Sequence, residues 1–164
     1  MSNIKIAIYS EKDRQEVSDL ILGIQTNEFN IRISLDEQPD LKNIPGFYQV
    51  NKGNFWIATV DDKLAGTIGL LDIGNQNGAL RKMFVDAEYR GKEHGIGQRL
   101  LNTLINWAEN KDFKKIFLGT TEKFIAAHRF YEKNNFIEIE KKSLPGGFPV
   151  MGVDVKFYKY IINA

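Results

Sequence analysis

Residues 80–101 read LRKMFVDAEYRGKEHGIGQRLL and join an apolar strand to an amphipathic helix through a loop that contains three glycines. Glycine lets a backbone approach an anion closely, and the first amides of a helix have no acceptor within the helix. The helix dipole adds roughly half a positive charge at the same place. We therefore predict that this glycine loop, residues 90–98, binds a pyrophosphate through its main-chain amides.

Other interpretations of a glycine-rich loop must be weighed, because glycines alone can make a merely flexible connection. A phosphate loop of the Walker type needs Gly-Lys-Ser/Thr at the helix start, where this chain has Gly97-Gln98-Arg99. A dinucleotide-binding fold needs a parallel strand-helix-strand unit, whereas the strands before this loop are predicted to be antiparallel. The basic residues Arg90, Lys92 and Arg99 that flank the loop favour an anion site.

Hydrophobic periodicity predicts the elements around this stretch. Strands are expected at 4–8, 55–60, 64–73, 80–85, 116–118, 136–139 and 153–162. Helices are expected near 17–24, briefly near Leu41, from Ile96 to Ala108, and at 125–131 after a Thr121 cap. The order describes an α+β fold, a mixed sheet with helices on its faces.

Length and composition bound the class of protein. The 164 residues suit one domain, 1–164, and 43% apolar with 26% charged residues is typical of a globular chain. The absence of cysteine excludes disulfides and a cysteine nucleophile, and two histidines argue against a zinc site, so we expect no metal. A net charge of +1 favours neither nucleic acid nor a membrane surface as partner. Without an apolar run or a signal-peptide pattern, we expect a cytoplasmic protein.

Two motifs resemble the GNAT superfamily of N-acyltransferases. Its signature, Val-x-x-x-x-Arg-Gly-x-Gly-x-Gly/Ala before a leucine-rich helix, is matched in order by Val85, Arg90, Gly91, Gly95, Gly97, Leu100 and Leu101. Residues 126–136, AAHRFYEKNNF, are similar to the family's Ala-x-x-x-Tyr-Glu-Lys-x-Gly-Phe block. The resemblance implies a GNAT-like α+β fold, with a central mixed, mostly antiparallel sheet of about seven strands and helices on both faces.

The resemblance also implies a function. It implies an N-acetyltransferase that uses acetyl-coenzyme A (acetyl-CoA) as cosubstrate and moves the acetyl group to a primary amine of a small molecule or peptide in a ternary complex. The cosubstrate would pair with the strand residues Met83, Phe84 and Val85, which a splayed neighbouring strand leaves free, and its pyrophosphate would bind Arg90, Gly91, Lys92, Glu93, His94, Gly95, Ile96, Gly97 and Gln98. Tyr131 would be the general acid for the departing thiolate.

Three features of the sequence depart from the family pattern. The glycine loop is two residues longer than the commonest form, so we expect its phosphate contacts to differ. Phe124 stands where the family often has an asparagine, and its side chain cannot donate a hydrogen bond. Asn135 replaces the usual glycine at the helix end, a mild change because asparagine accepts a left-handed conformation.

Several assignments stay open at this point. Asp72, Glu122 and Glu28 are candidate bases, although each is more often a surface carboxylate. Tyr131 could instead be a core aromatic. His128 is expected to be structural and His94 exposed in the loop.

The acceptor and the class of function are also open. The resemblance places the acceptor near residues 28–50 and 141–151, whose composition does not select one amine. A non-catalytic coenzyme A sensor and a generic nucleotide-binding protein are the rival functions. A homodimer is undecided, since family members often pair through sheet edges or C-terminal strands.

Overall fold

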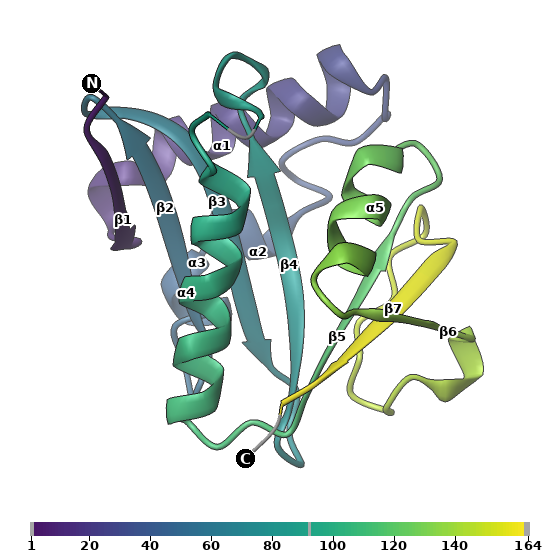
Figure 1. Cartoon of the computed structure of the whole chain (residues 1–164). Coiled ribbons are helices and arrows are strands. Elements are labelled where there is room, and N and C mark those ends of the chain that lie inside the picture. The colour runs from purple at the N-terminus through teal and green to yellow at the C-terminus, as the bar shows by residue number, and fades with distance from the viewer. Residues whose placement is uncertain (1, 92, 163–164) are drawn as a thin grey trace.

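The computed structural model describes residues 2–91 and 93–162 and confirms the predicted α+β fold (Figure 1). One seven-stranded sheet has the order β1-β2-β3-β4-β5-β7-β6, and among the described strands β4–β5 is the single parallel pair. The strands are β1 Ile4–Ile8, β2 Asn54–Val60, β3 Lys63–Asp72, β4 Asn77–Val85, β5 Lys115–Thr120, β6 Ile137–Ile139 and β7 Lys156–Ile161.

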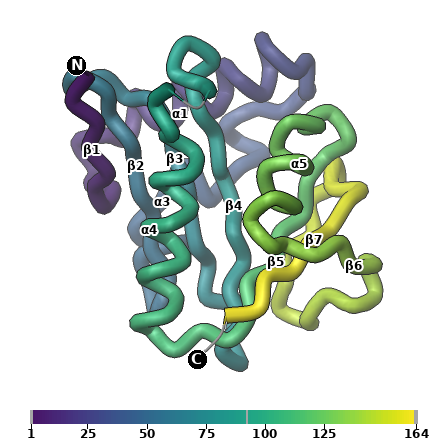
Figure 2. The backbone as a smooth tube through the Cα atoms, in the orientation of Figure 1, coloured from purple at the N-terminus to yellow at the C-terminus, as the bar shows by residue number. Residues whose placement is uncertain are grey.

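Helices cover both faces of the sheet (Figures 1 and 2). They are α1 Arg14–Gly23, α2 Pro39–Lys42, α3 Ile44–Phe47, α4 Ile96–Asn110 and α5 Ile125–Lys133. A π-helical turn, Ile24–Glu28, continues α1. Helices α4 and α5 lie on one face, and α1, α2 and α3 lie on the other. The short helices α2 and α3 lie in the irregular segment before β2, where one short helix near Leu41 was expected.

Each face of the sheet has its own hydrophobic core. On the first face, Leu100, Leu101 and Leu104 of α4 are fully buried against the strands. On the second face, Val17 and Ile21 of α1 pack with residues of α2, α3 and β2. Complete burial of a leucine side chain contributes about 1.5–3 kcal/mol to stability, so these buried side chains hold α4 and α1 to the sheet. Trp107 of α4 donates its Nε1–H to the carbonyl of Lys52, which fixes the far end of that helix.

Strands β4 and β5 pair over only three residues each. The register joins residues 77–79 to residues 115–117, and β5 then pairs with β7 along its whole length. From Leu80 to Val85, no other described strand pairs with the outer edge of β4. Figures 1 and 2 show the two strands side by side at one end and apart at the other. This opening agrees with the splayed strands implied by the family resemblance.

A β-bulge interrupts β4 where it separates from β5. Arg81 lies opposite Gly69 and Phe84 lies opposite Thr67, so two residues of β4 occupy the space of one on β3. Lys82 takes the left-handed conformation with φ of 54°, and its carbonyl accepts a hydrogen bond from the Thr67 hydroxyl at 2.7 Å. The bulge shifts the side-chain alternation of the strand at this point.

Two local predictions were wrong. Thr121 does not cap α5, because the chain makes an extra turn in which Phe124 N–H bonds the Thr121 carbonyl, and Phe124 is the residue before the helix. The last strand begins at Lys156 rather than residue 153, because Asp154 N–H bonds the Met151 carbonyl in a turn.

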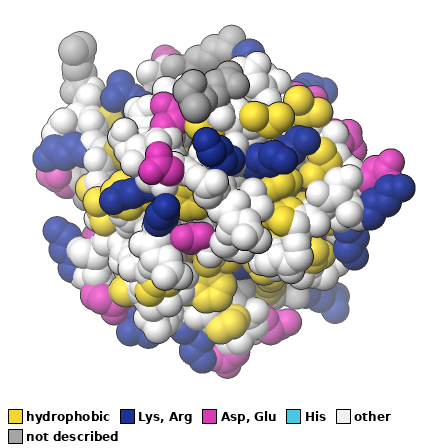
Figure 3. All heavy atoms as spheres, turned by 90° about the horizontal axis from the view of Figure 1, so that it is seen from below, with side chains coloured by type: hydrophobic (Ala, Val, Ile, Leu, Met, Phe, Trp, Pro, Cys, Tyr) yellow, Lys and Arg dark blue, Asp and Glu magenta, His cyan; other side chains and the backbone are white. Residues whose placement is uncertain are grey.

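Charged side chains of both signs are interspersed over the face seen in Figure 3, in keeping with the net charge of +1. In the part of the chain that the structure describes, no helix combines the length and the apolar character that crossing a membrane requires.

Candidate functional site

A cleft of about 830 Å³ lies where β4 and β5 separate. It follows β4 from Leu80 to Val85, and the glycine loop with the start of α4 lines it beyond Val85. Residues of β5 and α5 form one wall, and residues of the π-helical turn and the chain after it form another. The splayed strands therefore create a hollow that is lined along its length by the unpaired edge of β4.

The glycine loop presents main-chain amides to this cleft. Gly91 and Gly95 have positive φ angles of 108° and 60°, and a Cβ atom at either position would meet no atom within 4 Å. The first helical bond of α4 runs from Arg99 N–H to the Gly95 carbonyl at 3.0 Å. The amides of residues 96–98 have no acceptor within the helix, so they are available to an anion.

Most residues that were predicted to bind the cosubstrate line the cleft. They are Met83, Phe84, Val85, Arg90, Gly91, Gly95, Ile96, Gly97 and Gln98. Glu93 and His94 are not among the lining residues, and Lys92 lies outside the described residues. His94 is partly buried, with its ring 5.7 Å from that of Tyr89, rather than exposed as expected. The binding roles of all these residues stay predictions.

Arg90 is held by other groups of the protein. Its guanidinium forms a bidentate ion pair with Glu28, in which Nη2 lies 2.8 Å from Oε1, and its Nε donates to the Val85 carbonyl at 2.8 Å. The guanidinium also lies 5.9 Å from the centre of the Phe29 ring. Glu28 therefore compensates the positive charge that Arg90 brings to the glycine loop.

The three candidate bases do not line the cleft. Glu28 is engaged by Arg90. Asp72 accepts hydrogen bonds from the amides of Lys52 and Gly74 at the end of β3, and Glu122 is exposed. None of the three candidates is therefore placed by the cleft lining as a base.

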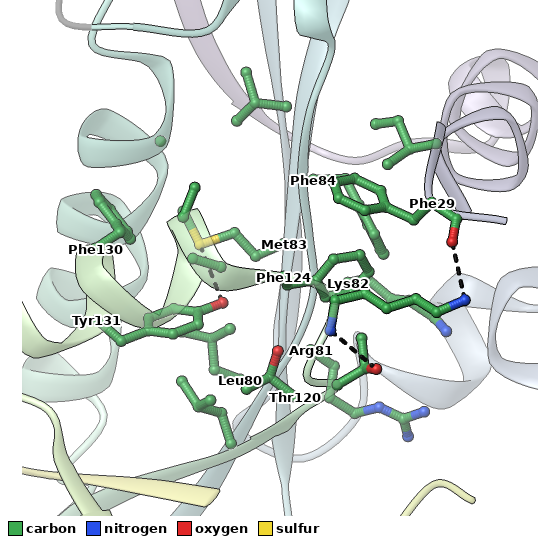
Figure 4. Close-up of a pocket in the computed structure, with 18 of the residues that line it drawn as sticks. Phe29, Leu80, Arg81, Lys82, Met83, Phe84, Thr120, Phe124, Phe130 and Tyr131 are labelled. Atoms are coloured by element: carbon green, nitrogen blue, oxygen red, sulfur yellow. Dashed lines mark hydrogen bonds between the residues drawn. The ribbon is translucent and has the colours of Figure 1, made fainter. Parts of the chain in front are cut away.

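Tyr131 lies in the core and also lines the cleft. Its ring is buried in the core, 5.5 Å from the Phe136 ring, while its hydroxyl donates a hydrogen bond to Met83 Sδ at 3.6 Å on the cleft side (Figure 4). Burial raises the pKa of Tyr131 above its usual value, so the phenol is protonated at neutral pH. A role as general acid stays a prediction.

An aromatic cluster closes one side of the cleft. The Phe124 ring lies 4.7 Å from that of Phe29 and 6.1 Å from that of Phe84, in edge-to-face contacts (Figure 4). Lys123 donates to the carbonyls of Phe29 and Asn30 at 3.2 and 3.3 Å. Phe124 thus packs where the family often has a hydrogen-bonding asparagine, and its neighbour Lys123 joins the two walls.

His128 has a structural partner, as expected. Its Nε2 lies 2.9 Å from the Thr121 carbonyl, which ties α5 to the turn before it.

Sequence reasoning missed several charged residues of the cleft lining, among them two on β4 and one before β7. These three are Arg81, Lys82 and Asp154. Burial lowers the pKa of Lys82 to about 8, and burial raises the pKa of Asp154, whose carboxylate accepts the Met151 amide at 3.0 Å. The available signal was two adjacent cations within an otherwise apolar strand, since charged residues are rarely buried without a partner.

Among the described residues, no group of three or more histidine, aspartate or glutamate side chains could hold a metal ion. The cleft lining offers main-chain amides, tyrosine and threonine side chains and a few charged side chains.

Comparison with known proteins adds to this geometry. The family model described as "Acetyltransferase (GNAT) family" matches residues 21–136. A crystal structure of a GNAT-family acetyltransferase from Staphylococcus aureus Mu50 is 42% identical, with a TM-score of 0.95, and covers 98% of this chain and 100% of that one. An acetyltransferase from Streptococcus agalactiae is 31% identical with a TM-score of 0.91, covering 96% and 98%.

A curated relative gives a partial match. The N-acetylaspartate synthetase of Xenopus tropicalis is 34% identical over 112 residues, which are 65% of this chain and 41% of that protein. The chain thus aligns with about two fifths of the relative's length. At the level of the fold alone, the PaiA N-acetyltransferase of Thermoplasma acidophilum, whose structure is a complex with coenzyme A, has a TM-score of 0.71 at 20% identity.

Proposed function

This chain belongs to the GNAT family of acetyltransferases and is an acyltransferase that depends on acetyl-CoA, and from that premise we propose that it acetylates a primary amine of a small molecule or peptide. The observation that carries the proposal is the single cleft that connects the glycine loop, the free edge of β4 and the Tyr131 hydroxyl. Transfer takes place directly between the two substrates in a ternary complex.

The cleft suits the cosubstrate at both ends of its carrier arm. The diphosphate is bound by the amides of residues 96–98 and by the backbone around Gly91 and Gly95, where open space above the glycines supports close approach. The pantetheine arm bonds the main-chain groups of Met83 to Val85, which β5 leaves free. Two structures of the same fold that hold coenzyme A or acetyl-CoA support this choice of cosubstrate.

The reaction forms a C–N bond and breaks a C–S bond. The neutral amine attacks the thioester carbon, an amide N–H of β4 polarises the carbonyl oxygen, and the C–S bond then breaks. The sulfur takes a proton from the Tyr131 hydroxyl, and the nitrogen's proton returns through water to the phenolate. Amine and acetyl-CoA thereby become an amide and a free thiol. At pH 7, an alkyl ammonium group must lose its proton first, which costs roughly 4–5 kcal/mol.

A calorimetric titration with acetyl-CoA tests the binding site. Gly95→Glu should weaken binding at least about tenfold, since its side chain and the strain at φ of 60° both disturb the glycine loop. Gly74→Glu is the matched control, because Gly74 also has positive φ and open space above it but lies in the β3–β4 hairpin. Wild-type affinity in Gly95→Glu would refute the assigned loop.

A non-catalytic coenzyme A sensor is the alternative function. Two observations favour the sensor. Phe124 stands in place of a hydrogen-bonding residue, and the three candidate bases do not line the cleft. Release of free thiol from acetyl-CoA over a panel of amines separates the two functions. Thiol release above the rate without amine supports the transferase, and tight binding without release supports the sensor.

We also propose that residues 1–164 act as one domain. The two hydrophobic cores share β2, because Trp56 packs on one face of that strand and Phe55 on the other. Thermal unfolding should therefore show one cooperative transition by both circular dichroism and tryptophan fluorescence.

A further inference from the structure

The bulge in β4 brings two cations to the same side of the strand. Neighbouring residues of a regular strand point to opposite faces. Arg81 and Lys82 both line the cleft, and both approach the carboxylate of Asp40, at 3.9 and 3.6 Å. A left-handed residue other than glycine costs about 1–3 kcal/mol, and such strain is concentrated at functional sites. The strained bulge is therefore what makes the pair.

One carboxylate serves both cations. Asp40 Oδ2 also accepts the Tyr48 hydroxyl at 2.6 Å, so its hydrogen-bonding capacity is shared three ways. Two positive charges against one negative charge leave +1 in a group whose side chains are at most 10% exposed. Asp154 also acts on the two cations, but it belongs to the segment before β7, so this wall of the cleft by itself carries a positive charge and is suited to an added anion.

The guanidinium of Arg81 has free hydrogen-bonding capacity. Its Nη2 makes only a long contact with Met151 Sδ, at 3.5 Å, besides the ion pair with Asp40. Within the ranges 2–91 and 93–162, neither its Nε nor its Nη1 donates a hydrogen bond. A planar guanidinium with free donors matches the two oxygens of a carboxylate.

Lys82 remains charged under ordinary conditions. Its Nζ donates to Gln38 Oε1 at 2.6 Å, and its pKa of about 8 keeps the ammonium form dominant at pH 7. Lys82 is followed in the chain by Met83, the first strand residue assigned to the pantetheine arm. A group bound by Lys82 would thus lie next to the acyl end of the cosubstrate.

A carboxylate faces the cations from the other side of the cleft. Asp154 lies before β7 and against β5, since a Cβ atom on Gly119 would come within 2.7 Å of its Oδ2. The cleft therefore has two cations on β4 and one anion beside β5. This arrangement is complementary to a molecule that carries an ammonium group and a carboxylate close together.

We propose that the acceptor is a free amino acid, whose carboxylate binds Arg81 and Lys82 and whose amine lies toward Asp154. The inference rests on the proposed function and narrows it, because a peptide N-terminus has no carboxylate next to its amine. Asp154 in this position binds the ammonium form and accepts hydrogen bonds from the amine.

A comparison of acceptors with the wild-type enzyme tests this directly. Thiol release from acetyl-CoA is measured with an equimolar mixture of the free amino acids and with the matching mixture of amino-acid amides. The amides keep the amine and the side chain but lack the negative charge of the carboxylate next to the amine. Their amine is less basic, so more of it is neutral, which by itself would favour their reaction. The free acids should react at least about tenfold faster, as expected for a lost charge-assisted hydrogen bond.

The outcomes separate this inference from the proposed function. The amino-acid site would be overturned if thiol release were equal or faster with the amides, or if only simple alkyl amines gave release. Either result would leave the proposed transferase function intact. No release with any amine, despite normal binding of acetyl-CoA, would overturn both.

Variants test the two cations. Arg81→Gln and Lys82→Gln should raise KM for the amino acid about tenfold or more and leave KM for acetyl-CoA nearly unchanged. Lys63→Gln, on an exposed residue of the β2–β3 hairpin, is the matched control. A folded Arg81→Gln protein with wild-type KM for the amino acid would contradict the inference. If both cation variants unfold, the comparison of acids with amides still decides it.

Discussion

The hydroxyl of Tyr131 donates a hydrogen bond to the sulfur of Met83 across 3.6 Å and thereby links α5 to the free edge of β4 (Figure 4). A thioether is a weak acceptor, so a thiolate in the cleft would compete well for this donor. The contact lies where the strand assigned to the pantetheine arm meets the residue assigned as acid. The contact therefore puts a proton donor beside the strand proposed to bind the cosubstrate.

Removal of this hydroxyl should affect turnover more than binding. Tyr131→Phe keeps the buried ring and loses one weak hydrogen bond, so we expect acetyl-CoA affinity and the unfolding midpoint to change little. Turnover should fall about a hundredfold, which is typical of a lost general acid. Steady-state kinetics with calorimetry measure both quantities. Tyr160→Phe, on β7 and outside the cleft lining, is the control, and unchanged turnover in Tyr131→Phe would return that residue to a purely structural role.

Much of this architecture was predictable because periodicity and the two family motifs agree. The apolar runs of β2, β3 and β4 indicate the sheet, the leucines of α4 indicate its covering helix, and the glycines mark the loop between β4 and α4. Tyr131 and the loop residues that line the cleft follow from the same motifs. These features depend on local residue patterns, which a sequence carries directly.

The grouping of these charges in the cleft was not predictable, and the reason is physical. A regular strand would separate Arg81 from Lys82, and lysine gives no signal for the left-handed conformation that brings them together. Asp154 was assigned to the last strand, whereas its amide bonds Met151 in a turn. Both features come from tertiary contacts of the bulge and the turn rather than from local propensity.

Release of Arg90 from its ion pair should strengthen cosubstrate binding. Glu28→Gln removes the carboxylate that compensates Arg90, so the glycine loop gains positive potential. Because both side chains are about one third exposed, the gain should be small, about threefold in acetyl-CoA affinity at low salt. The gain should shrink as salt rises. Glu16→Gln on α1 makes the same change in net charge and should have no effect. Calorimetry at two ionic strengths checks this, and equal affinities would show that Arg90 does not serve the loop.

The buried carboxylate of Asp40 should be important for stability. Asp40→Asn leaves Arg81 and Lys82 without their shared counter-charge, and loss of one partner in a buried ion pair typically costs about 3–5 kcal/mol. Asp36→Asn is the control, because Asp36 pairs with Lys42 at 2.8 Å on the surface and its loss should change stability little. Urea unfolding measures both variants. Similar midpoints would mean that the two cations are neutralised by another group.

The lowered pKa of Lys82 predicts how stability depends on pH. Burial holds this pKa at about 8 in the folded protein, against 10.5 for an ordinary lysine. Between these values the unfolded chain binds more protons at Lys82 than the folded chain does, so the free energy of unfolding rises with pH across that window. Below pH 8 both states are protonated, and the full cost of the buried ammonium is present. The charges around it are Asp40 from α2, Arg81 from β4 and Asp154 from the segment before β7.

Urea unfolding of the wild type and Lys82→Met over this window isolates the effect. From pH 7.5 to 9.5 the wild type should gain about 2 kcal/mol relative to the variant, because each unit of pKa difference corresponds to about 1.4 kcal/mol. The pH range stops at 9.5 because of the tyrosines. Burial raises the pKa of Tyr48 and Tyr158 in the folded protein, whereas in the unfolded chain they ionise near pH 10. Above pH 9.5 these tyrosines therefore make the free energy of unfolding fall as pH rises. Lys63→Met, which removes an exposed lysine, should show the same dependence of the free energy of unfolding on pH as the wild type. If Lys82→Met also showed the pH dependence of the wild type, the buried ammonium of Lys82 would have an ordinary pKa. The positive charge assigned to the β4 wall of the cleft would then persist well above pH 9.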